Sequence, residues 1–174
     1  KNVPALEQGL ADAKANVEAK EKALAETKAK AGVAQAEVDE AQKALVLKPD
    51  SEMAVLTYAQ VSSNTSEAID ILSAFLLKYP ESREVRISLA RLLLGQKKYE
   101  NARQEFEILL DSDPQDLMAL YSLGLLSIQE NDYISAEKYL ERYLGTSSAQ
   151  STENRQESIQ VLFLLSQIAE EQHR

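Results

Sequence analysis

The chain has 174 residues, of which 44% are hydrophobic and only 6% are aromatic, with five glycines and four prolines. Scarce glycine and proline favour helices over a β-rich fold, and the absence of cysteine excludes disulfides and thiolate metal sites. The formal net charge is −9, concentrated in residues 51–174, and an acidic surface repels phosphate backbones, so no nucleic acid is expected as a partner.

The sequence contains no run of the ~20 apolar residues that would cross a bilayer, so we expect no transmembrane segment. Because the chain begins at Lys1 rather than Met, we expect a trimmed soluble fragment that a signal peptide or lipid anchor could have preceded. A chain without cysteine suits the cytoplasm and the periplasm equally.

Residues 1–48 contain no aromatic side chain and are rich in Ala, Lys and Glu, which are strong helix formers. Apolar residues recur without a break at every seventh position, which is the spacing of a coiled-coil seam. They are Leu10, Val17, Leu24, Ala31, Val38 and Leu45. The second seam is poor, because Lys20 and Thr27 occupy it. The alternative is a degenerate repeat, a helical hairpin that turns near Gly32. The pattern leaves both a hairpin and one long helix open.

Residues 49–158 are predicted to form about three helix pairs, of which the first is compressed. Residues 52–60 are its short first helix, and residues 61–80 supply a turn at "SSNTS" and a second helix. Compared with the units that follow, about three residues are missing at this turn.

The unit at residues 83–116 has the clearest pattern. Ala102, Phe106, Leu109 and Leu110 recur at the spacing of one buried helix face. "GQKK" at residues 95–98 separates this second helix from the first, and Pro114 ends it, because a proline disfavours helical backbone in the residue before it.

The unit at residues 117–150 repeats this arrangement with a turn at "ENDY". We expect its second helix to end at Gly145, followed by "TSSAQST" as a linker. Residues 159–174 are predicted to be one more first helix, as a half-repeat or a capping helix, so that the chain stops inside a repeat.

These units share a period of 34 residues, which is the period of a helix–turn–helix repeat that stacks into a solenoid. The matching sets are Ala68, Ala102 and Ala136; Leu72, Phe106 and Leu140; Leu76, Leu110 and Leu144; Pro80 and Pro114; Leu89 and Leu123; Ala90 and Gly124; and Tyr99 and Tyr133.

The chain resembles tetratricopeptide repeat (TPR) proteins, whose motif combines an aromatic, Leu-Gly, a Tyr, Ala-x₃-Phe and Pro. One unit meets it with Leu89-Ala90, Ala102-x₃-Phe106 and Pro114, and the next with Leu123-Gly124, Tyr133 and Ala136-x₃-Leu140. The aromatic at the start of each first helix is missing, because Arg86 and Leu120 stand there. The resemblance implies an all-α, right-handed solenoid and a non-enzymatic scaffold that binds protein partners and needs no cofactor.

A narrower resemblance concerns residues 82–116 and 164–172. They are similar to TPR proteins exported by Gram-negative bacteria, many of which are outer-membrane lipoproteins that scaffold envelope machinery. This resemblance implies a periplasmic or outer-membrane-anchored protein, with the cytoplasm as the alternative.

In such an array the first helices line a concave groove. Helical spacing places ten residues on it: Leu56, Gln60, Ile87, Arg91, Leu94, Tyr121, Leu125, Ile128, Phe163 and Gln167. The set is mostly apolar with one cation, so we expect it to bind an apolar helix or extended segment. TPR proteins that bind acidic C-termini carry a clamp of Lys, Asn and Arg on this face, and no such clamp is expected here.

The competing interpretation is that many of these residues are ordinary core, or that residues 1–17 cover them. A second hypothesis for function is self-association through residues 1–48, which would make the protein a homo-oligomer.

We expect no catalytic, cofactor or metal site. The single histidine, His173, has no convergent groups around it in the sequence, and no nucleophile–base constellation or Gly-rich phosphate loop is present. Tyr139 and Tyr143 are expected to pack within the array, and the Glu170-Glu171 pair is expected on a solvated polar face.

Overall fold

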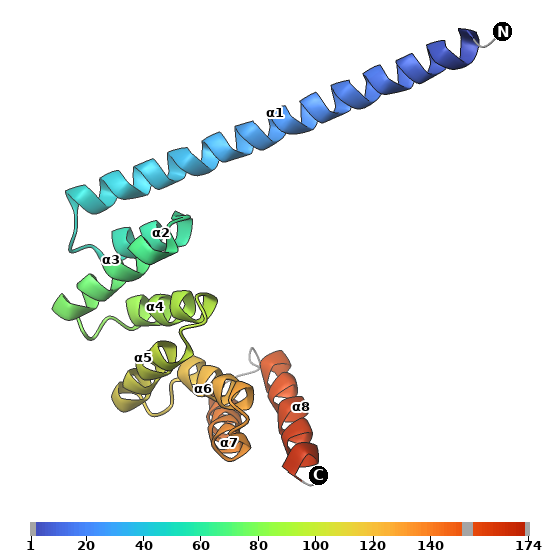
Figure 1. The fold of residues 1–174 in the computed structure, drawn as a ribbon. Coiled ribbons are helices and arrows are strands. Elements are labelled where there is room, and N and C mark those ends of the chain that lie inside the picture. Colours follow the sequence, from blue (N-terminus) through green and yellow to red (C-terminus); the bar gives the residue numbers. More distant parts are fainter. Residues whose placement is uncertain (1–2, 151–154, 173–174) are drawn as a thin grey trace. The chain divides into compact units, whose positions relative to one another are not determined.

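The computed structural model describes the backbone of residues 3–150 and 155–172, and the side chains of residues 19–146 and 158–171. Over these ranges the chain is helical, with no strand. The helices are α1 (Val3–Leu47), α2 (Glu52–Val61), α3 (Thr65–Lys78), α4 (Arg83–Gly95), α5 (Tyr99–Ser112), α6 (Leu117–Gln129), α7 (Tyr133–Gln150) and α8 (Arg155–Gln172) (Figure 1). The predicted all-α fold is confirmed.

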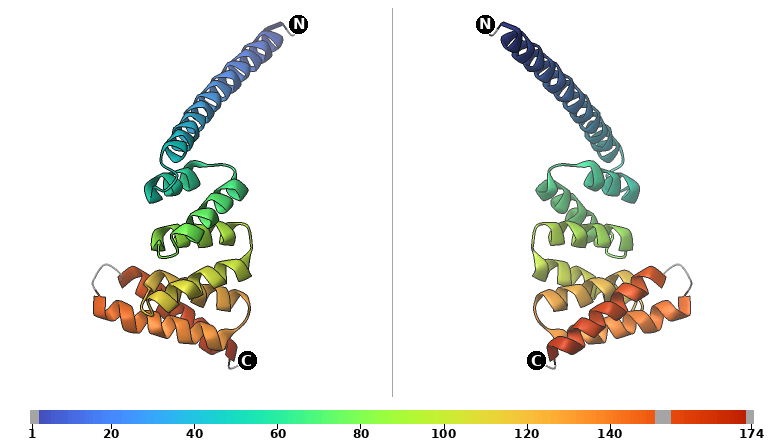
Figure 2. Two further views of the ribbon diagram at one scale, coloured as in Figure 1. Left: turned by 90° about the vertical axis from the view of Figure 1, so that its left-hand side faces the viewer. Right: turned by 90° about the vertical axis from the view of Figure 1, so that its right-hand side faces the viewer.

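The chain divides into two compact units, Lys1–Ser63 with α1 and α2, and Asn64–Arg174 with α3 to α8. In the second unit each helix packs against the next one along the chain, from α3 on α4 to α7 on α8. Figure 2 shows these helices running back and forth, which is the arrangement of a TPR-type solenoid.

Helix α1 is one uninterrupted helix of 45 residues, so the hairpin predicted to turn near Gly32 is wrong and the long-helix alternative holds. Gly32 has a helical neighbourhood on both sides and no atom within 4 Å of where its Cβ would be. A single glycine costs a helix about 1 kcal/mol relative to alanine, and the surrounding Ala, Lys and Glu outweigh that cost. Every described side chain from residue 19 to residue 37 is exposed.

The 34-residue period corresponds to the packing layers of the second unit. The repeated alanines Ala68, Ala102 and Ala136 are fully buried, as are the larger residues of the same period, Leu72, Phe106 and Leu140. Tyr143 is also buried, in a core cluster formed by residues of α6, α7 and α8. Tyr139 packs against this cluster, so both tyrosines pack within the array as predicted.

Gly124 permits a close approach between helices α6 and α7. A Cβ at this position would lie 2.6 Å from Leu140 Cδ2 and 2.8 Å from its Cγ, which is too close for van der Waals contact. The requirement for a small residue at this position of the repeat is therefore steric.

The turns α4–α5 and α6–α7 have the same hydrogen bonds. The N–H of Lys98 donates to Leu93 O, and the N–H of Asp132 donates to Ser127 O, each over 2.9 Å. The preceding residues, Lys97 (φ 59°) and Asn131 (φ 61°), are left-handed. This pattern is a Schellman-type helix end, and it confirms the turns predicted at "GQKK" and "ENDY".

The predicted end of a helix at Gly145 is wrong, because α7 continues to Gln150. Gly145 has no positive φ, so it does not form the left-handed cap that would stop the helix. The five residues after it contain neither Gly nor Pro, the two residue types that cost a helix most, so the helix continues through them. The last two residues of the predicted "TSSAQST" linker, Ser151 and Thr152, lie outside the described residues.

Two arginines of α4 link this helix to later helices, Arg83 to the start of α6 and Arg86 to α5. Arg83 Nε donates to Asp116 Oδ2 over 2.6 Å, and the other oxygen of this buried carboxylate caps α6 by accepting the N–H of Ala119. The hydrogen bond to Asp116 is the main reason that the pKa of Arg83 is raised, against the opposing effect of desolvation. Arg86, which replaces the aromatic of the TPR motif, is buried and bonds Glu105 and the carbonyl of Pro80.

Candidate functional site

The predicted groove residues of the second unit lie on α4, α6 and α8, the first helices of their repeats. Arg91 and Gln167 are exposed, Leu125 is 38% exposed and Phe163 is 64% exposed. The half-buried members of the set are Leu94, Tyr121 and Ile128. The structure therefore leaves an accessible, mainly apolar row on α6 and α8.

Ile87 differs from the other predicted groove residues because it is only 5% exposed. It belongs to the core of the repeats, since α4 packs against both α3 and α5, and it presents almost no surface to a partner. For this residue the ordinary-core interpretation holds.

Leu56 and Gln60 lie on α2, in the first unit, where Leu56 is half-buried and Gln60 is exposed. The predicted cover, residues 1–17, lies outside the described side chains. Cover of the groove by that segment stays a prediction.

Two of the groove side chains, Arg91 and Tyr121, make contacts with neighbouring side chains. Arg91 Nη2 lies 3.9 Å from Met118 Sδ, which brings the cation of α4 against the start of α6. The ring of Tyr121 packs on the buried ring of Tyr143, with centroids 5.8 Å apart. Met118 is missing from the predicted set, although its spacing of three residues before Tyr121 placed it on the same helix face.

A cavity of about 310 Å³ lies between the α6–α7 turn and the second half of α8. Its lining residues are Ile128, Tyr133, Leu164, Gln167, Ile168, Glu170 and Glu171. The structure thus brings two predicted groove residues, Ile128 and Gln167, to one site. The apolar part of the lining belongs to the cluster that packs α8 against α6 and α7.

Glu170 and Glu171, expected on a solvated face, are exposed and lie at this cavity. Asp132, next to Tyr133 in the chain, adds a further carboxylate near the turn. Hydrogen bonds from the Ser135 hydroxyl and then from its N–H lower the pKa of Asp132, so this group is ionised at neutral pH. The nearby Glu130 is paired with Arg103 over 2.5 Å.

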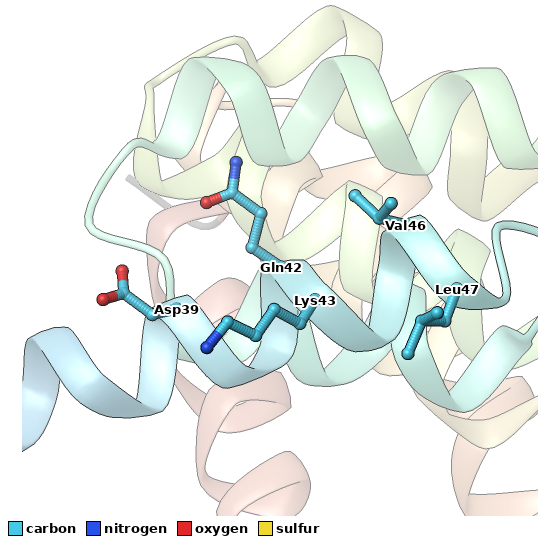
Figure 3. Close-up of a pocket in the computed structure, with 5 residues that line it drawn as sticks. All are labelled: Asp39, Gln42, Lys43, Val46 and Leu47. Carbon is cyan, nitrogen blue, oxygen red and sulfur yellow. The ribbon is translucent and has the colours of Figure 1, made fainter.

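Two other hollows lie away from the predicted groove residues. In the first unit, a hollow of about 540 Å³ is lined by the last turns of α1, through Asp39, Gln42, Lys43, Val46 and Leu47 (Figure 3). In the second unit, Glu107, Leu110, Asp111, Tyr139 and Arg142 line a polar hollow of about 390 Å³ between α5 and α7. Neither of them includes a predicted groove residue.

Groups that could support chemistry do not converge within the described residues. No cluster of three or more His, Asp or Glu side chains there could hold a metal ion. His173 lies outside the described residues. None of the helices described combines the length and apolar character needed to cross a membrane.

A family model described as tetratricopeptide repeat matches residues 57–116 and 88–152. Among curated proteins, the chain is 32% identical over 120 residues to the Protein CTR9 homolog of Arabidopsis thaliana, covering 63% of this chain. It is 30% identical over 103 residues to the Protein O-mannosyl-transferase TMTC3 of Homo sapiens, covering 57% of this chain. The match spans only 11% of the length of each of these proteins.

Among solved structures, the fold is similar to that of MamA from Desulfovibrio magneticus RS-1, with a TM-score of 0.61 and 20% identity. The similarity covers 71% of this chain and 72% of that one. At 20% identity, this similarity shows a shared fold and nothing further.

Proposed function

Because the chain belongs to the tetratricopeptide repeat family, we propose that it is a non-enzymatic scaffold that binds a partner protein through an apolar helix or extended peptide. The proposed binding surface is the row of accessible side chains on the first helices of the second unit. It consists of Arg91, Leu94, Tyr121, Leu125, Ile128, Phe163 and Gln167.

The observation that carries this proposal is the exposure of large apolar side chains on α6 and α8. Fully burying an exposed leucine or phenylalanine contributes about 1.5–3 kcal/mol, so Phe163, at 64% exposure, would supply more of the affinity than Leu125, at 38%. Each helix of the array is held by its neighbours, so a partner would meet a preformed surface and binding would need little rearrangement.

Substitution of Leu125 and Phe163 by serine tests the groove. Cross-linking and mass spectrometry of the full-length protein in its native source identify the partner, and capture of that partner is compared between variants. We expect Leu125→Ser with Phe163→Ser to lose capture while circular dichroism stays helical.

The matched control changes two exposed apolar residues on second helices, Leu77→Ser and Ile134→Ser, which are 89% and 79% exposed. This control should capture the partner normally. Equal capture by both double variants would rule out the proposed groove.

The proposal extends to a role in envelope assembly in a Gram-negative bacterium, as a periplasmic or outer-membrane-anchored protein. Its support is the resemblance of residues 82–116 and 164–172 to exported TPR proteins. Cell fractionation of the full-length protein with its native N-terminus tests this location, and recovery in the cytoplasmic fraction would contradict it.

A second candidate function is self-association through α1. The heptad of apolar residues and the complete exposure of residues 19–37 favour it, because a helix of this length would gain stability from a copy of itself. Sedimentation should then show a concentration-dependent oligomer that becomes monomeric when residues 1–48 are deleted. A monomer at every concentration would exclude this candidate.

A further inference from the structure

The cavity beside α8 combines two surfaces with different chemistry. Ile128, Leu164 and Ile168 supply apolar side chains, while Glu170 and Glu171 supply two carboxylates. The described lining residues include no lysine or arginine. A ligand at this site therefore meets apolar surface and negative charge side by side.

The charges around the α6–α7 turn add to this negative potential. Asp132 is ionised, and the nearby cation, Arg103, is already engaged by Glu130. Residues 51–174 as a whole carry 11 Lys and Arg against 19 Asp and Glu. Such a surface attracts cationic segments from a distance and repels anionic ones.

The cation of the proposed groove lies on a different helix from these carboxylates. Arg91 belongs to α4 and contacts Met118 at the start of α6, whereas Glu170 and Glu171 belong to the second half of α8. The apolar residues Tyr121, Leu125 and Ile128 lie on the intervening first helix, α6. The groove thus has a basic end on α4 and an acidic end on α8.

We propose that the cavity between the α6–α7 turn and α8 binds a basic amphipathic segment of a partner protein. An apolar side chain of that segment packs against the half-buried Ile128 and Leu164 at the cavity, and a lysine or arginine one helical turn away lies against Glu170 and Glu171. This inference rests on the proposed function and specifies the chemistry and the orientation of the partner.

The carboxylates at the cavity are exposed, so the ion pairs act mainly on selectivity and association rate. We expect a basic segment to bind about five- to tenfold more tightly than the same segment with glutamine in place of its lysines. Added salt should weaken this preference, because exposed charges are screened.

Selection of a random dodecapeptide phage library on the full chain tests the proposal without knowledge of the natural partner. The selected peptides should carry lysine or arginine within one helical turn of a large apolar residue. Labelled versions are then titrated by fluorescence anisotropy against the variant Glu170→Gln with Glu171→Gln, at about 50 mM and about 300 mM NaCl.

We expect this variant to bind the selected peptides about five- to tenfold more weakly and to lose most of the salt dependence. The matched control is Glu107→Gln with Asp111→Asn, which removes two exposed carboxylates from the hollow between α5 and α7. The control should bind as the unchanged protein does.

The outcomes separate this inference from the proposed groove. Neutral or acidic selected peptides, or basic peptides that bind the glutamine variant unchanged, would overturn the inference. If Leu125→Ser with Phe163→Ser still abolishes binding in that case, the groove stands without its charge preference. Peptides insensitive to both variants, or no enriched peptide, would overturn both.

Discussion

Helix α1 runs for 45 residues with all of its described side chains from residue 19 to residue 37 exposed, whereas α5, with 14 residues, buries Ala102, Phe106 and Leu109. An isolated helix shorter than about 12–15 residues is marginal in water, so α5 depends on packing against α4 and α6. Helix α1 relies instead on its length and on the helix propensity of Ala, Lys and Glu. The same secondary structure therefore responds differently to substitution in the two regions.

The largest expected effect is that of emptying the core of the repeats. Phe106→Ala should destabilise the second unit by about 3–5 kcal/mol, because a fully buried ring is replaced by a cavity. Urea unfolding followed by circular dichroism measures the change. Val33→Ala in α1 is the control and should change stability by about 0.5 kcal/mol or less. Similar losses for both variants would contradict the distinction between the regions.

Glycine-to-alanine substitutions should have opposite signs in the two regions. Gly124→Ala places a methyl group 2.6 Å from Leu140 Cδ2 and should cost about 1–3 kcal/mol. Gly32→Ala meets no atom within 4 Å and should stabilise α1 by about 0.5–1 kcal/mol. Thermal unfolding of both single variants provides the comparison, and a stabilised Gly124→Ala would show that Leu140 yields without cost.

Loss of the Asp116 carboxylate should have a smaller effect within the second unit. Asp116→Ala removes both the cap of α6 and the partner of Arg83, at a cost of about 1–2 kcal/mol. Chemical unfolding measures it, with Glu84→Ala as the control because both side chains of the Arg83–Glu84 pair are exposed. An equal effect of the two substitutions would show that the α6 cap contributes nothing.

The smallest expected effect is a pH dependence at the start of α7. The pKa of Asp132 is lowered from its ordinary value of 3.8, so the ionised carboxylate stabilises the folded state above that pH. This contribution is lost as pH falls through the folded-state pKa. Asp132→Asn should therefore lower the thermal midpoint more at about pH 6 than at about pH 3, and an equal shift at both values would contradict the assignment.

The repeats could be predicted from the sequence because the residues that define them act locally and recur. Ala102 and Phe106 lie on one helix face, and their counterparts 34 residues away repeat the same layer. The turns at residues 95–98 and 130–133 follow from polar residues that cannot extend the apolar faces. These features need no knowledge of distant contacts.

The failures of prediction concern residues whose role depends on the rest of the structure. Gly145 was expected to end a helix, and a turn near Gly32 was one of two alternatives. A glycine costs a helix only about 1 kcal/mol, so the helix propensity of the whole segment decides whether the helix continues. Arg86 stands where the repeat motif has an aromatic residue. Its hydrogen-bond partners, Glu105 and the carbonyl of Pro80, come close to it only when the helices pack. The position of Glu170 at a cavity likewise depends on the docking of α8.

The matching turns of the second unit have a consequence for building new arrays. Lys97 and Asn131 occupy the same left-handed position with the same backbone hydrogen bonds, although their side chains differ. The segment 83–116 also contains both members of the Arg83–Asp116 pair. A duplicated copy of this segment, inserted after Asp116, would therefore supply its own turn and its own arginine–aspartate ion pair. It would lengthen the array by one helix pair, including one further first helix for binding.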